Sequence, residues 1–423
     1  MTLGSLSRRP SRGFTLVELM VAVTGGLFVS LAVFALASDG SRFYRRESRV
    51  ADATLSTIVG FERLRMDVAR AGFLSSPNVR RDPRVCGTPA TDPSWPAELS
   101  TLAALRIAKG GSPANTTLTA NGIAADSLVL SGSYTSPDQF PIWNVQSTGA
   151  MHIVYLQANI GPLARMGYSS STNQAALLSS VFGVGRGLRI QDPSGELQFG
   201  TIRTTNAGAI PQVVLANQPS LTYRQTAGAT CGLKGNVTGA VANVLNFVRY
   251  DLRNLSSSPA TPSAASAYAP AYGDSLTAEW DGDRTDLVRV ELDTAGTPID
   301  GTEELVAEYA VDFRLGLTVI SGLLNSDPTL STLLPEDAAV GAWTDVLGVN
   351  PTIAPQRIRS VRVRLAVRTR EPDREENVTA ALVPGLAGGM YRIGLGPSAG
   401  APFARVRTMQ ADVALHNQAG VLW

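Results

Sequence analysis

The sequence predicts an α+β protein with a long N-terminal α-helix, membrane-spanning in its first half, packed on an antiparallel β-sheet within an enlarged β-rich globular domain. Three observations predict this fold class. No proline occurs between Pro10 and Pro77, so a helix can run there without interruption. Residues 19–38 carry no charged side chain. After residue 72, stretches that alternate apolar and polar residues are separated by turns rich in glycine and proline, which is typical of strands.

Composition excludes several classes of function. The 423 residues carry a formal net charge of +1, so no strong field attracts nucleic acid. The chain has only two histidines and two cysteines, and their wide separation lacks the spacing of a zinc site. We therefore expect no enzyme, no catalytic residues and no cofactor.

The first element is a helix from Phe14 to about Ala71, which would span roughly 85 Å. Its first half is apolar on all sides, and its second half is amphipathic. Gly72 is typical of the residue that follows a helix. The apolar positions of the second half recur at helical spacing: Phe43, Val50, Ile58, Phe61, Leu64 and Val68.

The uncharged stretch at 19–38 is long enough to span a membrane, because twenty helical residues rise about 30 Å. A buried core helix or a cleaved secretory signal would fit the same composition, and the letters ALAS at 35–38 resemble a cleavage site. Glu18 at the apolar edge and the continuing helical pattern argue against a secretory signal. Arginines precede and follow the span, so charge alone does not decide its orientation.

The stretch RGFTLVELMVAV resembles the class III signal of type IV pilins and type II secretion pseudopilins. The resemblance covers about 30 residues. It implies that a prepilin peptidase removes the leader, residues 1–13, by cleaving after Gly13 and then methylates the new N-terminal Phe14. It also implies a cytoplasmic N-terminus, with residues 72–423 forming a periplasmic or extracellular domain.

This resemblance predicts a role for Glu18. An ionised carboxylate is costly in hydrocarbon unless it is paired. In a bundle of staggered helices, the free amine of Phe14 in one subunit would neutralise Glu18 of the next and set their axial register. The alternative is a glutamate at the membrane edge that extends to water.

Beyond the helix, residues 73–95 are expected to form an irregular connection, and residues 303–313 to begin as a short helix or a strand. Residues 109–122 and 256–275 have the composition of surface insertions. The predicted strands are 126–134, 151–157, 187–202 (with a turn at Pro-Ser-Gly), 211–217, 244–252, 286–293, 311–320, 358–370 and 404–417.

Five segments resemble, in the same order, those of minor pilins of the PilW type. They are LRMDVARAGF with Cys86 after it, DSLVLSGSY, EELVAEYAVDFRLGL, IRSVRVRLAVRTR and RTMQADVALHN. The resemblance implies a minor pilin that primes assembly of the type IV pilus and lies at or near its tip, serving twitching motility and cell adhesion. It implies as partners the other minor pilins, the major pilin, the prepilin peptidase, the inner-membrane assembly platform and a PilY-type tip adhesin.

Two alternatives stay open: a minor, J-like pseudopilin of a type II secretion system, and an adhesive ectodomain on a membrane anchor.

Two further sites are candidates. Cys86 and Cys231 would form a disulfide in an oxidising compartment or remain unrelated thiols. Asp281, Asp283 and Asp286 are a calcium candidate, although an Asp-Gly turn explains the same letters and the spacing of an EF-hand is absent.

Overall fold

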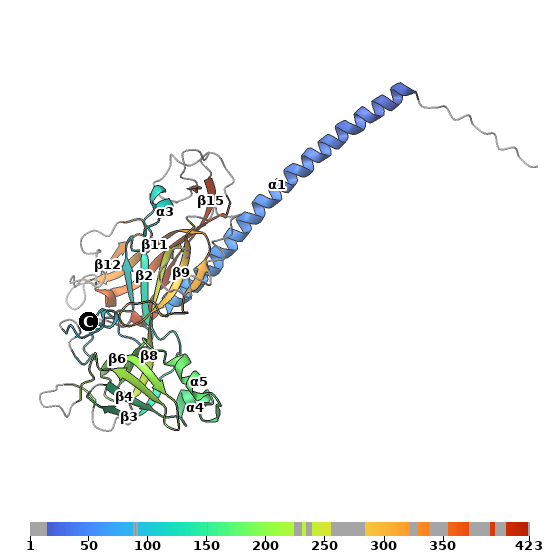
Figure 1. Ribbon diagram of the computed structural model, residues 1–423. Coiled ribbons are helices and arrows are strands. Elements are labelled where there is room, and N and C mark those ends of the chain that lie inside the picture. The colour runs from blue at the N-terminus through green and yellow to red at the C-terminus, as the bar shows by residue number, and fades with distance from the viewer. Residues whose placement is uncertain are drawn as a thin grey trace, which may run out of the picture. The chain divides into compact units, whose positions relative to one another are not determined.

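The computed structural model describes residues 15–87, 89, 92–149, 151–223, 231–233, 239–254, 284–321, 329–337, 354–371, 390–393 and 403–421. The chain forms two compact units, Met1–Asp52 and Ala53–Trp423. Helix α1 (Leu16–Ala69) supplies the described part of the first unit and continues into the second (Figure 1). Together with the antiparallel sheets that follow, it confirms the predicted α+β class.

Within the second unit, α1 buries one face. Ala53, Thr57, Phe61, Leu64 and Val68 are all buried, and their spacing of three or four residues defines a single stripe along the helix. The helix ends where Gly72, with a φ of +77°, donates its backbone N–H to the carbonyl of Ser131 at 2.8 Å. Gly72 therefore closes the helix, as the sequence predicts.

Strand β8 (Val241–Arg253) connects two parts of the β structure, because its two halves pair with different sets of strands. Its first half closes an antiparallel barrel with five other strands, each paired to the next and the last to β8. In spatial order these are β5 (Gly187–Gln191), β6 (Leu197–Asn206), β7 (Gln212–Ala216), β4 (Met151–Leu156) and β3 (Phe140–Ser147). Closure leaves this part of the sheet without free edges.

The barrel has its own core, which includes Phe140, Val154, Leu188, Ile202 and Val213. Three short helical segments contribute side chains to that core. They are α4 (Gly161–Arg165), η1 (Tyr168–Ser170) and α5 (Gln174–Val181). Two of them, α4 and α5, lie beside the barrel in Figure 1.

The second half of β8 pairs with β2 (Ser127–Gly132) and β9 (Asp286–Leu292). β1 (Leu105–Ala108) extends this region beside β2, and β10 (Glu304–Ala307) extends it beside β9. A separate sheet has the order β12 (Thr329–Leu333), β11 (Ala310–Ser321), β13 (Ile358–Arg368), β15 (Phe403–Ala414) and β14 (Met390–Arg392). The largest core joins α1 to side chains from both regions, including Phe61, Leu128, Tyr250 and Phe313.

Several local predictions agree with these elements and others need refinement. The hairpin predicted across residues 187–202 forms as β5 and β6. Residues 303–313, expected to be a short helix or a strand, form β10 and the start of β11 with Tyr309 at a φ of +54° between them. The expected insertion at 109–122 contains α3 (Thr116–Ala120), because the Asn115 side chain caps its N-terminus. Residues 256–275 lie outside the described residues.

The connection between α1 and the sheets contains turns and the short helix α2 (Ala97–Ser100). Two 3₁₀ segments, η3 (Pro355–Arg357) and η4 (His416–Gln418), adjoin β13 and β15. The strand β3 was missed by sequence reasoning, because Pro141 interrupts its pattern.

Candidate membrane-anchor and assembly site

The N-terminal half of α1 exposes apolar side chains on every side. Leu16, Met20, Leu27, Phe34 and Leu36 are each between 60% and 76% exposed. Among the described residues, α1 is the one helix long and apolar enough to cross a membrane. Exposed apolar surface of this extent is unfavourable in water, so this half of the helix requires lipid or other helices around it.

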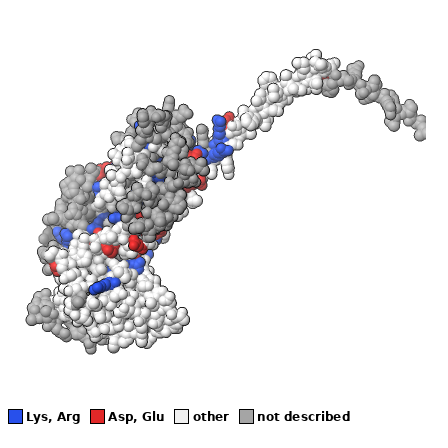
Figure 2. Space-filling model, in the orientation of Figure 1, with Lys and Arg blue, Asp and Glu red and all other residues white. Residues whose placement is uncertain are grey.

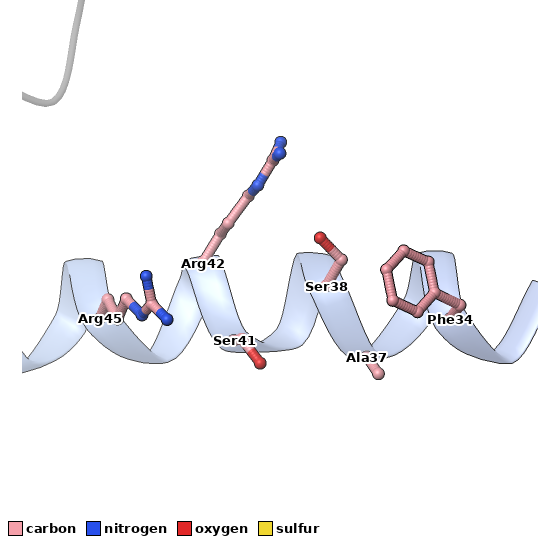
Figure 3. A pocket seen from close by; sticks show the side chains of 6 residues that line it. All are labelled: Phe34, Ala37, Ser38, Ser41, Arg42 and Arg45. Atoms are coloured by element: carbon pink, nitrogen blue, oxygen red, sulfur yellow. The ribbon is translucent and has the colours of Figure 1, made fainter.

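Figure 3 shows the end of the apolar stretch in a shallow hollow along one face of α1. Phe34 and Ala37 are followed by Ser38 and Ser41, and then by the cationic residues Arg42 and Arg45. The hollow is open and lies on a single helix, so it is not a ligand site. The order from apolar to hydroxyl to guanidinium is that of a membrane-spanning helix leaving the hydrocarbon for the interface.

Glu18 lies in the first turn of α1 and caps that turn together with Thr15. Its Oε2 accepts hydrogen bonds from the Thr15 backbone N–H at 3.0 Å and from the Thr15 hydroxyl at 2.9 Å. In return, Thr15 Oγ1 accepts from the backbone N–H of Glu18 at 3.3 Å. This is a reciprocal capping box, which satisfies two N–H groups that the helix leaves unpaired.

Sequence reasoning missed this capping role, although the pattern Thr-x-x-Glu before an apolar run was visible in the residues 15–18. The box does not use the full capacity of the carboxylate, because both bonds go to Oε2 and a carboxylate offers about four acceptor positions. Glu18 can therefore cap its own helix and accept from an amine. Gly13 and Phe14, the predicted cleavage and methylation residues, lie outside the described residues.

At the other end of α1, Asp67 connects the helix to the sheet. Its side chain is buried, and Oδ2 accepts from Tyr250 Oη at 2.7 Å and from Arg289 Nε at 2.8 Å. The Tyr134 hydroxyl also donates to the Asp67 carbonyl, at 2.9 Å. Burial raises the pKa of Tyr250 well above its ordinary value, and the nearby Asp67 charge adds to this shift. In the sequence, Asp67 lies on the apolar stripe between Leu64 and Val68, and an acidic residue at such a position predicts a buried partner.

Gly60 permits close approach of α1 to β10. A Cβ at this position would lie 2.7 Å from the carbonyl oxygen of Val306 and 2.8 Å from Ala307 Cβ. Both distances are shorter than carbon contacts allow. The backbone of β10 therefore packs directly on the helix at Gly60.

Cys86 and Cys231 form a disulfide in the structure, with their Cα atoms 5.7 Å apart. Two backbone bonds join the neighbourhood of Cys86 to β6, since Cys86 N donates to the Leu197 carbonyl and Leu197 N donates to the Arg84 carbonyl. The backbone bonds thus tie the connection after α1 to β6, and the disulfide ties it to the segment between β7 and β8.

Of the three aspartates in the calcium candidate, the structure describes one, Asp286. Asp286 begins β9 fully buried, and both its oxygens accept from Arg284 Nε, at 2.9 and 3.1 Å. The Tyr309 N–H also donates to Asp286 Oδ1, at 2.7 Å. A guanidinium thus occupies the place that a cation would take at Asp286. Asp281 and Asp283 lie outside the described residues, and in the described part of the chain no three acidic, histidine or cysteine residues are grouped to hold a metal.

The chain matches the family model for the prokaryotic N-terminal methylation motif over residues 8–24. No curated protein and no solved structure shows a significant match to the chain. The motif overlaps the capping box and the start of the exposed apolar helix. The combination indicates a membrane-anchored protein with the N-terminal signal of type IV pilins and pseudopilins.

Proposed function

We propose that this pilin-like protein is a minor pilin that primes assembly of the type IV pilus and is incorporated at or near the pilus tip. The observation that carries the proposal is the start of α1. There the methylation motif, a capped carboxylate and an apolar surface exposed on all sides occur together. A helix with these properties is suited to move from a lipid bilayer into a bundle of similar helices.

Glu18 provides the specific part of that bundle. Two apolar helices can pack side by side at many axial offsets of nearly equal energy. A buried ion pair between them can form at only one offset, and so it selects that offset. The amine that leader removal would create on Phe14 can meet Glu18 of an adjacent subunit. The capping bonds to Thr15 hold the carboxylate near the helix N-terminus, where such an amine would arrive.

The size of the second unit supports a place near the end of a fibre. It extends from Ala53 to Trp423 and contains both a closed barrel and a separate sheet. Subunits repeated along a helical fibre pack their domains against those of their neighbours, and a larger domain leaves less room for that packing. A subunit present in few copies at one end is free of this restriction.

As partners we propose the other minor pilins, the major pilin, the prepilin peptidase and the inner-membrane assembly platform, with a PilY-type adhesin above the tip. The protein would first lie in the inner membrane, with a cytoplasmic N-terminus and a periplasmic domain, and would later be extracellular at the tip. The proposed role involves no catalytic step, and no nucleic acid.

The second candidate is a minor pseudopilin of a type II secretion system, because the methylation motif is shared between both assemblies. A deletion strain separates the two. We expect the strain to lose its surface pili while it still secretes exported enzymes normally, and the wild-type gene to restore the pili. Normal piliation with loss of secretion would establish the second candidate, and an uncleaved N-terminus in the mature protein would leave only a membrane-anchored ectodomain.

A further inference from the structure

The outer face of the barrel carries a row of aromatic and amide side chains that crosses four neighbouring strands. The register pairs Tyr155 of β4 with Gln212 of β7, and Gln212 with Asn206 of β6. On the other side of Tyr155, a bulge in β3 between Ile142 and Asn144 directs Trp143 outward. We call Trp143, Tyr155, Gln212 and Asn206 the barrel row.

The aromatic half of the barrel row is exposed and ordered. Trp143 is 54% exposed, although a tryptophan is ordinarily largely covered. Its ring packs edge-to-face on Tyr155, with ring centroids 6.3 Å apart and planes at 88°. The Tyr155 hydroxyl donates to Gln146 Oε1 at 2.9 Å, which holds the ring in place.

The amide half presents donors and acceptors together. Asn206 Nδ2 donates to Gln212 Oε1 at 3.3 Å, so the two amides lie side by side. Each amide carries both a donor group and an acceptor oxygen, and one bond between them leaves most of this capacity for a ligand. Both side chains are at least partly exposed.

The four strands that carry the barrel row have almost no charged side chains. Arg203 is the sole charged side chain in strands β3, β4, β6 and β7. Between Asp138 and Arg186 the sequence has one charged residue, Arg165, and it pairs with Asp138 at 2.5 Å. In Figure 2 the barrel, at the foot of the view, is mostly white, and coloured side chains are more frequent among the described residues above it.

We propose that the barrel row binds a neutral oligosaccharide. Sugar rings present C–H groups that pack on aromatic faces and hydroxyl groups that pair with amides, and a neutral ligand matches a face that lacks charge. The row crosses three inter-strand spacings, about 14 Å, which is longer than a single sugar ring. Nucleic acid would require a line of cations along the strands, and the four described strands of the row carry a single cation, Arg203.

A proline-rich peptide is the competing ligand for an aromatic surface. Such peptides enter a groove between parallel aromatic rings. Here the Trp143 and Tyr155 rings pack directly against each other, so no groove separates them. The amides beyond Tyr155 also favour a ligand with many hydroxyl groups. Sugar binding does not depend on incorporation into a pilus, so the proposed function and this inference can fail separately.

The test uses the full chain in micelles of a zwitterionic detergent, because detergents with sugar head groups would compete. Hexasaccharides of β-1,4-linked glucose, β-1,4-linked N-acetylglucosamine and α-1,4-linked glucose are titrated, with binding followed by calorimetry. We expect at least one to bind, and Trp143→Ala and Gln212→Ala each to weaken that binding by about tenfold or more. Val184→Ala, which removes another exposed apolar side chain, 63% exposed in the turn between α5 and β5, is the control and should bind normally.

Equal melting temperatures for the variants and the wild type verify folding, since Trp143 is largely outside the core. The inference is overturned if none of the three hexasaccharides binds at millimolar concentration, or if Trp143→Ala binds as well as the wild type. Binding of a decaproline peptide that is lost in Trp143→Ala would replace the sugar with a peptide ligand. Loss of minor-pilin partners from pull-downs of Trp143→Ala, without sugar binding by the wild type, would make the row a subunit interface.

Discussion

The Asp67 carboxylate of α1 accepts a hydrogen bond of 2.7 Å from the hydroxyl of Tyr250 in β8, and both side chains are buried. Arg289 donates to the same carboxylate oxygen, so one acidic residue holds a tyrosine and a guanidinium from two strands. The contact lies where β8 passes between β2 and β9. It joins the helix to the strand that also closes the barrel.

Asp67→Ala is expected to destabilise the second unit by about 3 kcal/mol, because the buried Tyr250 hydroxyl would lose its acceptor and Arg289 would be left with its ion pair to Glu304. Asp67→Asn keeps one acceptor oxygen and should cost less. The matched control is Glu62→Ala, which removes an exposed pair with Arg65 and should cost about 0–1 kcal/mol. Urea unfolding of the three variants measures the differences, and equal losses for Asp67→Ala and Glu62→Ala would contradict the role of Asp67.

Gly60→Ala should lower the melting temperature, although alanine is favoured over glycine in a helix by about 1 kcal/mol. The new methyl group would meet the Val306 carbonyl at 2.7 Å and force β10 away from α1. Gly40→Ala is the control, since nothing lies within 4 Å of the Cβ position there. Thermal unfolding followed by circular dichroism measures both, and an unchanged or higher melting temperature for Gly60→Ala would show that the two elements can separate without cost.

Two substitutions at Glu18 separate capping from charge pairing. Glu18→Gln retains an oxygen for the two bonds from Thr15 but has no charge, whereas Glu18→Ala loses both functions. If the carboxylate pairs with the Phe14 amine of a neighbour, both variants should insert and be cleaved normally but lose co-purification with the minor pilins. Surface pili are counted in parallel. Normal assembly of Glu18→Gln with defective assembly of Glu18→Ala would assign Glu18 to capping alone.

Gly13→Ala should block removal of the leader, because the resemblance to class III signals implies a peptidase site that accepts a residue with almost no side chain. Mass spectrometry of the membrane-bound protein is expected to find the unprocessed N-terminus. Gly4→Ala, within the same leader, serves as the control and should be processed. A mature chain of Gly13→Ala that still begins at Phe14 would be inconsistent with this type of signal.

The stability of the barrel should fall as the pH decreases from about 7 to about 5, with His152 as one cause. His152 is buried in β4, and its Nε2 accepts from the Leu221 N–H at 3.2 Å. Burial lowers the pKa of His152 in the folded state below its ordinary value. As the pH falls, the unfolded chain therefore binds a proton at His152 before the folded chain does. The stabilisation by neutral His152 is present above the pKa of the unfolded state and is lost as the pH falls below it.

His152→Gln retains an acceptor for Leu221 but does not titrate, so its stability should depend less on pH than that of the wild type over this range. Urea unfolding at pH 7 and pH 5 measures the two slopes. Identical slopes would mean that His152 does not contribute, and the acidic side chains would account for the whole dependence.

Much of the architecture was predictable from local patterns. A helix is defined by hydrogen bonds between residues four apart, so the missing prolines and the apolar stripe were sufficient to predict α1 from residues within one window. Glu18 stood out for a similar local reason, as a carboxylate at the edge of an uncharged stretch. Most of the strands were visible through their alternation, which again depends only on neighbouring residues.

Tertiary structure decided how those strands pair and which side chains meet. β8 pairs with β3 and β5 in its first half and with β2 and β9 in its second, and no local pattern contains that division. The meeting of Asp67 with Tyr250 joins residues 183 positions apart, and the barrel row draws one side chain from each of four strands. Such contacts depend on chain closure over long separations, where the free energy is shared among many distant residues. The sequence by itself therefore determined the anchor and its signal, whereas the barrel and its outer face arise only from the folded chain.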